Sequence, residues 1–276
     1  MSYLQAIVIG LLQGITELFP VSRQSADESF YLAFLVGLHL ATAVALLVHY
    51  RRDWIALTRG FAHSLRRRRV EGPTERLAWL LIVATIPVGI VGLAFEHALR
   101  TLFAKPLAAA IFLTINGVIL LGGEQLRRRQ TPVTRARSLG AAAAPTRAGR
   151  RIEDLSLHDG VSIGAAEILA LFAGISRSGV TMVAGLLRGL DHEHAARFSF
   201  MLATPVILAA GLYKLHDLLG PNSDGLHGQI IVGSIVAGLA AYAAVRFLER
   251  FFRTNTLVPF AVYCLGVGGL SIIRFA

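Results

Sequence analysis

The sequence from Ile163 to Leu190 reads IGAAEILALFAGISRSGVTMVAGLLRGL, and it places a charged residue, Arg177, between two apolar stretches. Each stretch is shorter than the roughly 20 apolar residues that a helix needs to cross a hydrocarbon core of about 30 Å. Short apolar segments interrupted by glycine are typical of re-entrant hairpins that line a site at membrane depth. The segment therefore predicts a helix hairpin with Arg177 where its two arms meet.

The polar group at this junction has the chemistry of a phosphate site. The helix that begins near Ser178 turns its free N–H groups and its positive dipole end toward the junction, which favours an anion. The guanidinium of Arg177 offers paired donors that match phosphate oxygens. The candidate phosphate-binding residues are Ser176, Arg177, Ser178, Gly179 and Thr181. In the alternative interpretation, a serine caps the helix and Arg177 extends to the membrane surface.

The composition of the whole chain indicates a membrane protein. Of its 276 residues, 54% are hydrophobic and only 16% are charged, whereas soluble domains are about a quarter charged. Six runs have the length and polarity of membrane spans: 30–50, 77–94, 107–123, 198–215, 229–245 and 257–273. We therefore expect an all-α polytopic membrane helical bundle, with residues 1–276 forming a single integral membrane domain in a lipid bilayer.

The basic residues are concentrated between these runs. The net charge is +10, and 16 of the 27 basic residues lie within 51–76 and 127–151. Positive charge between spans marks cytoplasmic loops. Basic and aromatic residues do not interleave, and no recognition motif for nucleic acid is present, so we do not expect a nucleic-acid partner.

An internal repeat relates two distant parts of the chain. The segment Glu17–Arg23 can be aligned with Leu171–Arg177, and the same register places Gln13 opposite Glu167. With both arginine-rich segments inside, the two units have opposite orientations. Inverted-topology repeats with re-entrant helix hairpins usually meet at a central site. We expect a first repeat over 1–124, a cytoplasmic Arg-rich linker over 125–157 and a second repeat over 158–276.

Several polar residues lie within apolar segments. Gln13 and Glu17 are four residues apart and share one helix face; Glu17 suits a general base, a proton shuttle or a cation ligand, or the two form a hydrogen-bonded pair between the repeats. Glu167 either matches Glu17 or pairs with Arg177. For His39, within a span, we expect packing or hydrogen bonding. The run Asp191–His194 resembles a metal tract but falls in a predicted turn, so we interpret it as a solvated loop.

Two segments resemble the signatures of the undecaprenyl-diphosphate phosphatase family, the bacitracin-resistance type of membrane lipid phosphatase. Leu12–Ser22 is similar to the first signature, and Gly174–Thr181 matches the second, Pro-Gly-x-Ser-Arg-Ser-Gly-x-Thr. The resemblance implies hydrolysis of undecaprenyl diphosphate to undecaprenyl phosphate and inorganic phosphate in the cell inner membrane, which recycles the carrier lipid of cell-wall synthesis. It also implies catalytic positions at Gln13, Glu17, Ser22 and Arg177.

The first signature departs from the family after Ser22. The family continues Ser-Ser-x-Gly-His, and its histidine is a candidate nucleophile or acid–base group, whereas Arg23–Asp27 contains no Gly-His pair. The repeat differs in the same place, because 21 steps separate Arg177 from Phe198 but 7 separate Arg23 from Phe30. The first repeat therefore lacks a return arm. A lipid or solute transporter, or a catalytically impaired lipid-binding homologue, is the alternative function.

The resemblance also bears on cofactors and assembly. A divalent cation, Mg²⁺ or Ca²⁺, is a candidate cofactor with Glu17 as one candidate ligand, but the sequence holds no complete ligand set. The expected partners are undecaprenyl diphosphate and the bilayer. A homodimer is the assembly to be tested.

Overall fold

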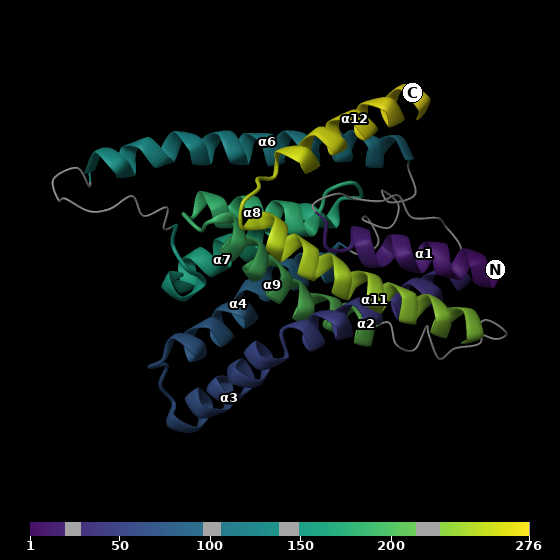
Figure 1. The fold of residues 1–276 in the computed structure, drawn as a ribbon. Helices are drawn as coiled ribbons and strands as arrows, with labels where there is room; N and C mark the ends of the chain where they lie inside the picture. Colours follow the sequence, from purple (N-terminus) through teal and green to yellow (C-terminus); the bar gives the residue numbers. More distant parts are fainter. Residues whose placement is uncertain (20–28, 96–105, 138–148, 214–226, 276) are drawn as a thin grey trace.

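The computed structural model describes residues 1–19, 29–95, 106–137, 149–213 and 227–275, with side chains described outside 29–33 and 130–137. Helices make up nearly all of this described part, and no strand occurs in it (Figure 1). In chain order the elements are α1 (Tyr3–Thr16), α2 (Ser29–His49), α3 (Arg51–Arg67), α4 (Pro73–Ala94), α6 (Pro106–Arg137), η1 (Ile152–Asp154), α7 (Leu157–Ala166), η2 (Glu167–Leu171), α8 (Arg177–Leu187), α9 (His192–Tyr213), α11 (His227–Phe252) and α12 (Val258–Phe275).

Five helices are long and apolar enough to cross a membrane, namely α4, residues 106–129 of α6, α9, α11 and α12. The remaining predicted span corresponds to α2, whose segment Phe34–His49 meets α3 at an angle of 85°. Helices α6 and α12 lie side by side along one edge of the molecule, and α1 lies beside α11 (Figure 1). The predicted polytopic, all-α membrane architecture is confirmed.

The arginine-rich stretch after α2 is more ordered than a loop. Its first part forms α3, which packs one face against α4. In that contact the rings of Phe61 and Trp79 lie 5.1 Å apart, and Trp79 Nε1 donates a hydrogen bond to Ser64 Oγ at 2.9 Å. Because apolar residues recur at helical spacing among the arginines, this segment folds as an amphipathic helix.

The segment from α7 to α8 is a hairpin whose two ends lie together. The backbone N–H of Arg150 donates to Gly189 O at 2.9 Å, and Asp159 pairs with both Arg150 and Arg188, at 3.0 and 3.3 Å. Against the effect of burial, hydrogen bonds from Ser156 and Arg150 hold the pKa of Asp159 at about 2. The segment therefore starts and ends on the same side of the bundle, as predicted for a re-entrant hairpin.

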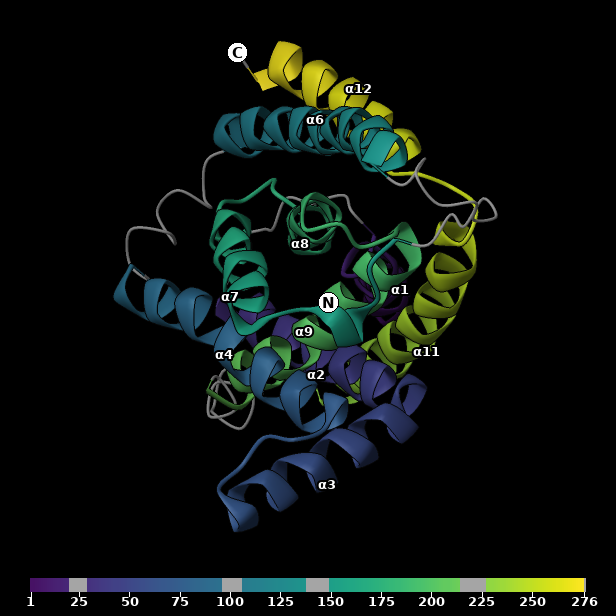
Figure 2. The same cartoon turned by 90° about the vertical axis from the view of Figure 1, so that its left-hand side faces the viewer.

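A glycine makes the turn at the far end of this hairpin. Gly174 has a φ of +105°, and a methyl group on it would overlap the carbonyl oxygen of Ala109 in α6. Only glycine combines this backbone conformation with so close an approach. The turn therefore brings the start of α8 into the centre of the bundle, with α6 and α12 on one side and α9 and α2 on the other (Figure 2).

Each half of the chain contributes a short helix that packs on a long helix of the other half. Helix α1 packs on α11, where a side chain at Gly10 would overlap Gly233 O; helix α7 packs on α4, where one at Gly164 would overlap Ala84 O. Gly10 and Gly164 are 154 residues apart, the offset of the sequence repeat. This reciprocal packing supports an inverted repeat. The division into 1–124, 125–157 and 158–276 stays a prediction.

The glycine contacts predict the outcome of adding one methyl group. Gly164→Ala would push α7 away from α4, because the new Cβ would overlap Ala84 O. We expect the midpoint of thermal unfolding of the purified protein to fall by about 5 °C. Gly89→Ala is the matched control, because a Cβ on this α4 residue would meet nothing within 4 Å. Equal midpoints for the two variants would contradict the close packing of α4 and α7.

Candidate active site

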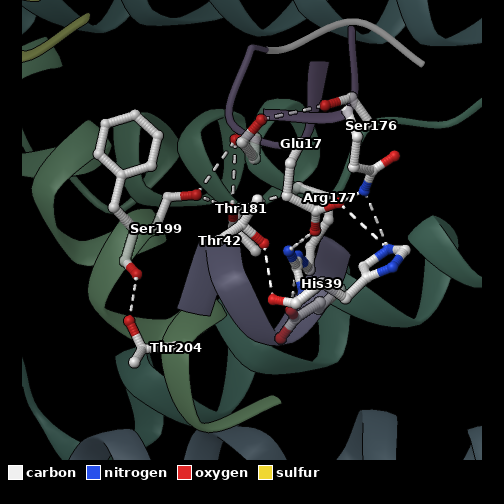
Figure 3. Close-up of polar contacts among 12 residues, drawn as sticks. Glu17, His39, Thr42, Ser176, Arg177, Thr181, Ser199 and Thr204 are labelled. Atoms are coloured by element: carbon white, nitrogen blue, oxygen red, sulfur yellow. Dashed lines mark hydrogen bonds and ion pairs between the residues drawn. The ribbon is translucent and has the colours of Figure 1, made fainter. Parts of the chain in front are cut away.

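An ion pair between the two halves of the chain forms the centre of the site. Arg177 is the first residue of α8, and its guanidinium donates to Glu17 Oε1 at 2.5 Å; Glu17 caps the C-terminal end of α1 (Figure 3). The two side chains are only 19% and 12% exposed. The sequence pattern placed both residues at candidate catalytic positions, and the fold brings them together across 160 residues.

Each member of this pair lies at the unfavourable end of its helix. A carboxylate at a helix C-terminus and a cation at an N-terminus each oppose the helix dipole, at a cost of about 0.3–1 kcal/mol. Glu17 and Arg177 both have this placement, and each offsets the other. Breaking a buried ion pair costs about 3–5 kcal/mol, so the pair outweighs the dipoles. A phosphate at Arg177 would keep the cation satisfied and would also match the dipole of α8.

A second carboxylate approaches Arg177 from the hairpin itself. Glu167 Oε1 lies 3.7 Å from Arg177 Nε, and the Glu167 side chain is 1% exposed. Among the residues that the structure describes, neither carboxylate oxygen of Glu167 has a hydrogen-bond partner. Of the two roles predicted for Glu167, pairing with Arg177 is the one observed.

Gln13 and His39 complete the polar cluster around Glu17. Gln13 Nε2 donates to Glu17 Oε2 at 2.7 Å and lies 3.1 Å from His39 Nε2. His39 Nε2 is 3.3 Å from Glu17 Oε2, and its Nδ1 is 2.7 Å from the carbonyl oxygen of Leu35. The prediction that His39 is hydrogen-bonded is confirmed. Its contact with Glu17 could not be found from the sequence, because 22 residues separate the two.

The hydroxyl groups of the second signature form hydrogen bonds to other parts of the protein beside the ion pair. Ser176 Oγ accepts from Gly179 N at 3.2 Å, and both Ser176 and Ser178 donate to Phe19 O, at 3.2 and 3.1 Å. Thr181 Oγ1 lies 2.5 Å from Ser199 Oγ. The helix cap by Ser176 is therefore observed. The side chain of Arg177 is paired with Glu17 and largely buried. Ser22 lies outside the described residues.

The comparison with known families places the chain in one of them. The family described as "Bacitracin resistance protein BacA" matches residues 6–270. The chain belongs to this family.

Close relatives within the BacA family carry enzyme names. A protein named "Undecaprenyl-diphosphatase 2" from Frankia alni is 50% identical over 100% of this chain and 98% of its own length. One named "Undecaprenyl-diphosphatase" from Mycolicibacterium paratuberculosis is 52% identical with the same coverage, in an alignment of 299 positions. Because this chain has 276 residues, that relative holds residues that the chain lacks.

The backbone at the start of α8 is held by α6. Ser176 N donates to Asn116 Oδ1 at 3.2 Å, and Asn116 Nδ2 donates to Cys264 Sγ at 3.3 Å. Gly179 lies against the same residues, because a Cβ on it would come within 3.1 Å of Leu120 and 3.4 Å of Asn116 Oδ1. We did not identify Asn116 from the sequence. Its position as a polar residue inside an apolar span was the available signal.

The interpretation of Asp191–His194 as a solvated loop is wrong for His192. This residue begins α9 and is 7% exposed, and its Nε2 lies 2.8 Å from Glu124 Oε2 of α6. Arg127 lies 2.9 Å from the other ring nitrogen. The side chain of His192 is buried because the start of α9 contacts α6 there. The number of charged residues along the sequence does not reveal this contact.

The serine contacts predict a stability effect. Ser176→Ala removes both the cap of α8 and a bond to Phe19 O. Loss of a cap costs about 0.5–2 kcal/mol, so the midpoint of thermal unfolding should fall. Ser162→Ala is the control, because this serine of the same hairpin bonds only to carbonyls of its own helix among the described residues. A Ser176→Ala midpoint within error of Ser162→Ala would exclude the proposed structural role.

Proposed function

We propose that this chain hydrolyses undecaprenyl diphosphate to undecaprenyl phosphate and inorganic phosphate. The observation that carries the proposal is Arg177 at the N-terminus of α8, facing Glu17, at the point where the two signatures meet. Membership of the BacA family and identities of 50–52% to proteins named as undecaprenyl-diphosphatases support it.

Arg177 and the helix end supply the electrostatic part of the reaction. In the transition state of phosphoryl transfer, negative charge spreads over three phosphoryl oxygens, and a guanidinium beside a helix N-terminus stabilises it. Arg177 exchanges Glu17 for the terminal phosphate when substrate binds. Glu17 is thereby released from Arg177 and keeps the 2.7 Å hydrogen bond from Gln13, which holds its carboxylate at the site.

The location follows from the substrate. A carrier lipid keeps its chain in the bilayer, and the polytopic fold holds Arg177 within reach of a lipid headgroup in the inner membrane. Release of the terminal phosphate recycles the carrier for peptidoglycan synthesis and would contribute to bacitracin resistance. A homodimer stays a prediction.

A divalent cation does not fit the surroundings of Glu17. Its oxygens already receive hydrogen bonds from Arg177 and Gln13, and His39 lies beside them. Among the residues that the structure describes, no group of three or more histidine, cysteine or acidic residues could hold a metal. A requirement for Mg²⁺ or Ca²⁺ stays a prediction.

Phosphate release from undecaprenyl diphosphate by the purified protein in detergent tests the function. Arg177→Ala should reduce turnover by at least about 100-fold, since it removes the main charge at the site. Arg177→Lys should give an intermediate rate, because it keeps the charge but loses the paired donors. Arg197→Ala is the control: it breaks a 2.7 Å pair with Asp53 outside the site and should stay within about twofold of wild type.

The outcomes separate the candidate functions. Equal release by wild type and Arg177→Ala would refute the phosphatase proposal. Binding of the lipid without release by wild type would favour a transporter or an impaired homologue.

A further inference from the structure

The described part of the site supplies a histidine from an unexpected element. The sequence after Ser22 lacks the Gly-His pair of the family, yet His39 of α2 lies 3.3 Å from Glu17 Oε2. We propose that His39 is the catalytic base of this phosphatase, in place of the histidine that the family signature has after the position of Ser22. The inference rests on the proposed function and names the residue that accepts the proton.

Hydrogen bonding fixes which ring nitrogen of His39 is available. A carbonyl oxygen can only accept, so the 2.7 Å contact with Leu35 O places the hydrogen on Nδ1. In the neutral ring Nε2 is then an acceptor, and Gln13 Nε2 lies 3.1 Å away to donate to it. In the protonated ring Nε2–H points to Glu17 Oε2. The cluster therefore stabilises both states of a proton acceptor.

Accessibility distinguishes His39 from its neighbours. Its side chain is 38% exposed, against 12% for Glu17 and 19% for Arg177. Of these three side chains, that of His39 is therefore the most accessible to a reactant that enters the site. Glu17 and Arg177 are the charged groups that act on this ring among the described residues.

The step assigned to His39 is the activation of water. When substrate binds, a water molecule replaces Gln13 as the donor to neutral Nε2. It gives Nε2 its proton while the water oxygen forms a bond to the terminal phosphorus, whose oxygens Arg177 holds. The bond from that phosphorus to the bridging oxygen breaks, and its electron pair leaves with undecaprenyl phosphate. The negative charge of Glu17, 3.3 Å from Nε2, stabilises the imidazolium formed until it releases its proton to solvent. Inorganic phosphate carries the oxygen that came from water.

His39→Gln tests the assignment, with His49→Gln as the matched control. His49 is on the same helix and also pairs with a glutamate, Glu249, at 2.8 Å, but it lies outside the site. In the phosphate-release assay with the full-length protein, His39→Gln should lower kcat by about 100-fold or more and change KM little, since general-base catalysis contributes about 10²–10⁴. His49→Gln should keep the wild-type kcat.

Two further readouts separate proton transfer from a structural role. In wild type and His49→Gln, kcat/KM should fall as the pH is lowered, because a protonated ring cannot accept a proton. His39→Gln should lose this acidic limb. Added imidazole should raise the rate of His39→Ala at least about tenfold toward wild type, because free imidazole can replace the missing base.

The results distinguish failure of this inference from failure of the function. Wild-type release with an inactive Arg177→Ala, combined with a His39→Gln kcat within twofold of wild type and an unchanged acidic limb, would overturn only the role of His39. Absence of imidazole rescue in a His39→Ala protein that still binds the lipid would also overturn it. Absence of release by wild type would overturn both proposals.

Discussion

The ion pair between Glu17 and Arg177 is the interaction on which the rest of the site depends. It joins the end of α1 to the start of α8, and it holds two charges that each oppose the dipole of their own helix. This arrangement stabilises the fold less than the reverse placement would, because a carboxylate is favourable at a helix N-terminus and a cation at a helix C-terminus. It is a suitable resting state for an anion site, since an incoming phosphate can replace the carboxylate without leaving the arginine unsatisfied.

The surrounding fold serves to keep these two helix ends together. The ion pair between Arg150 and Asp159 lies at the open end of the α7–α8 hairpin. At the other end, Gly174 makes the turn of this hairpin against α6. Asn116 then holds the backbone at Ser176, and the hydroxyls of that signature bond to Phe19 O, next to Glu17. Several residues that look like phosphate ligands in the sequence thus have a structural role in this state. The positive charge that would face a phosphate comes from Arg177.

The architecture and part of the site could be predicted from the sequence. Apolar run lengths identified the spans, and the short interrupted runs predicted the hairpin, because both follow from local composition. Glu17, Gln13 and Arg177 were identified because a polar residue in an apolar run is visible in the sequence. His39, Asn116 and His192 were not assigned their roles, since these depend on which helices pack together. The 85° bend between α2 and α3 accompanies the packing of α3 on α4 and likewise depends on which helices meet.

Competition between Glu17 and phosphate for Arg177 is the central claim, and the affinity of Glu17→Gln for undecaprenyl diphosphate tests it most directly. Removing the competing carboxylate should lower the Kd by about tenfold, or 1.4 kcal/mol, while turnover falls because the cluster around His39 loses its anion. Binding that is weaker than wild type, measured on a variant that remains folded, would show that Glu17 supports substrate binding and would contradict the exchange of partners at Arg177.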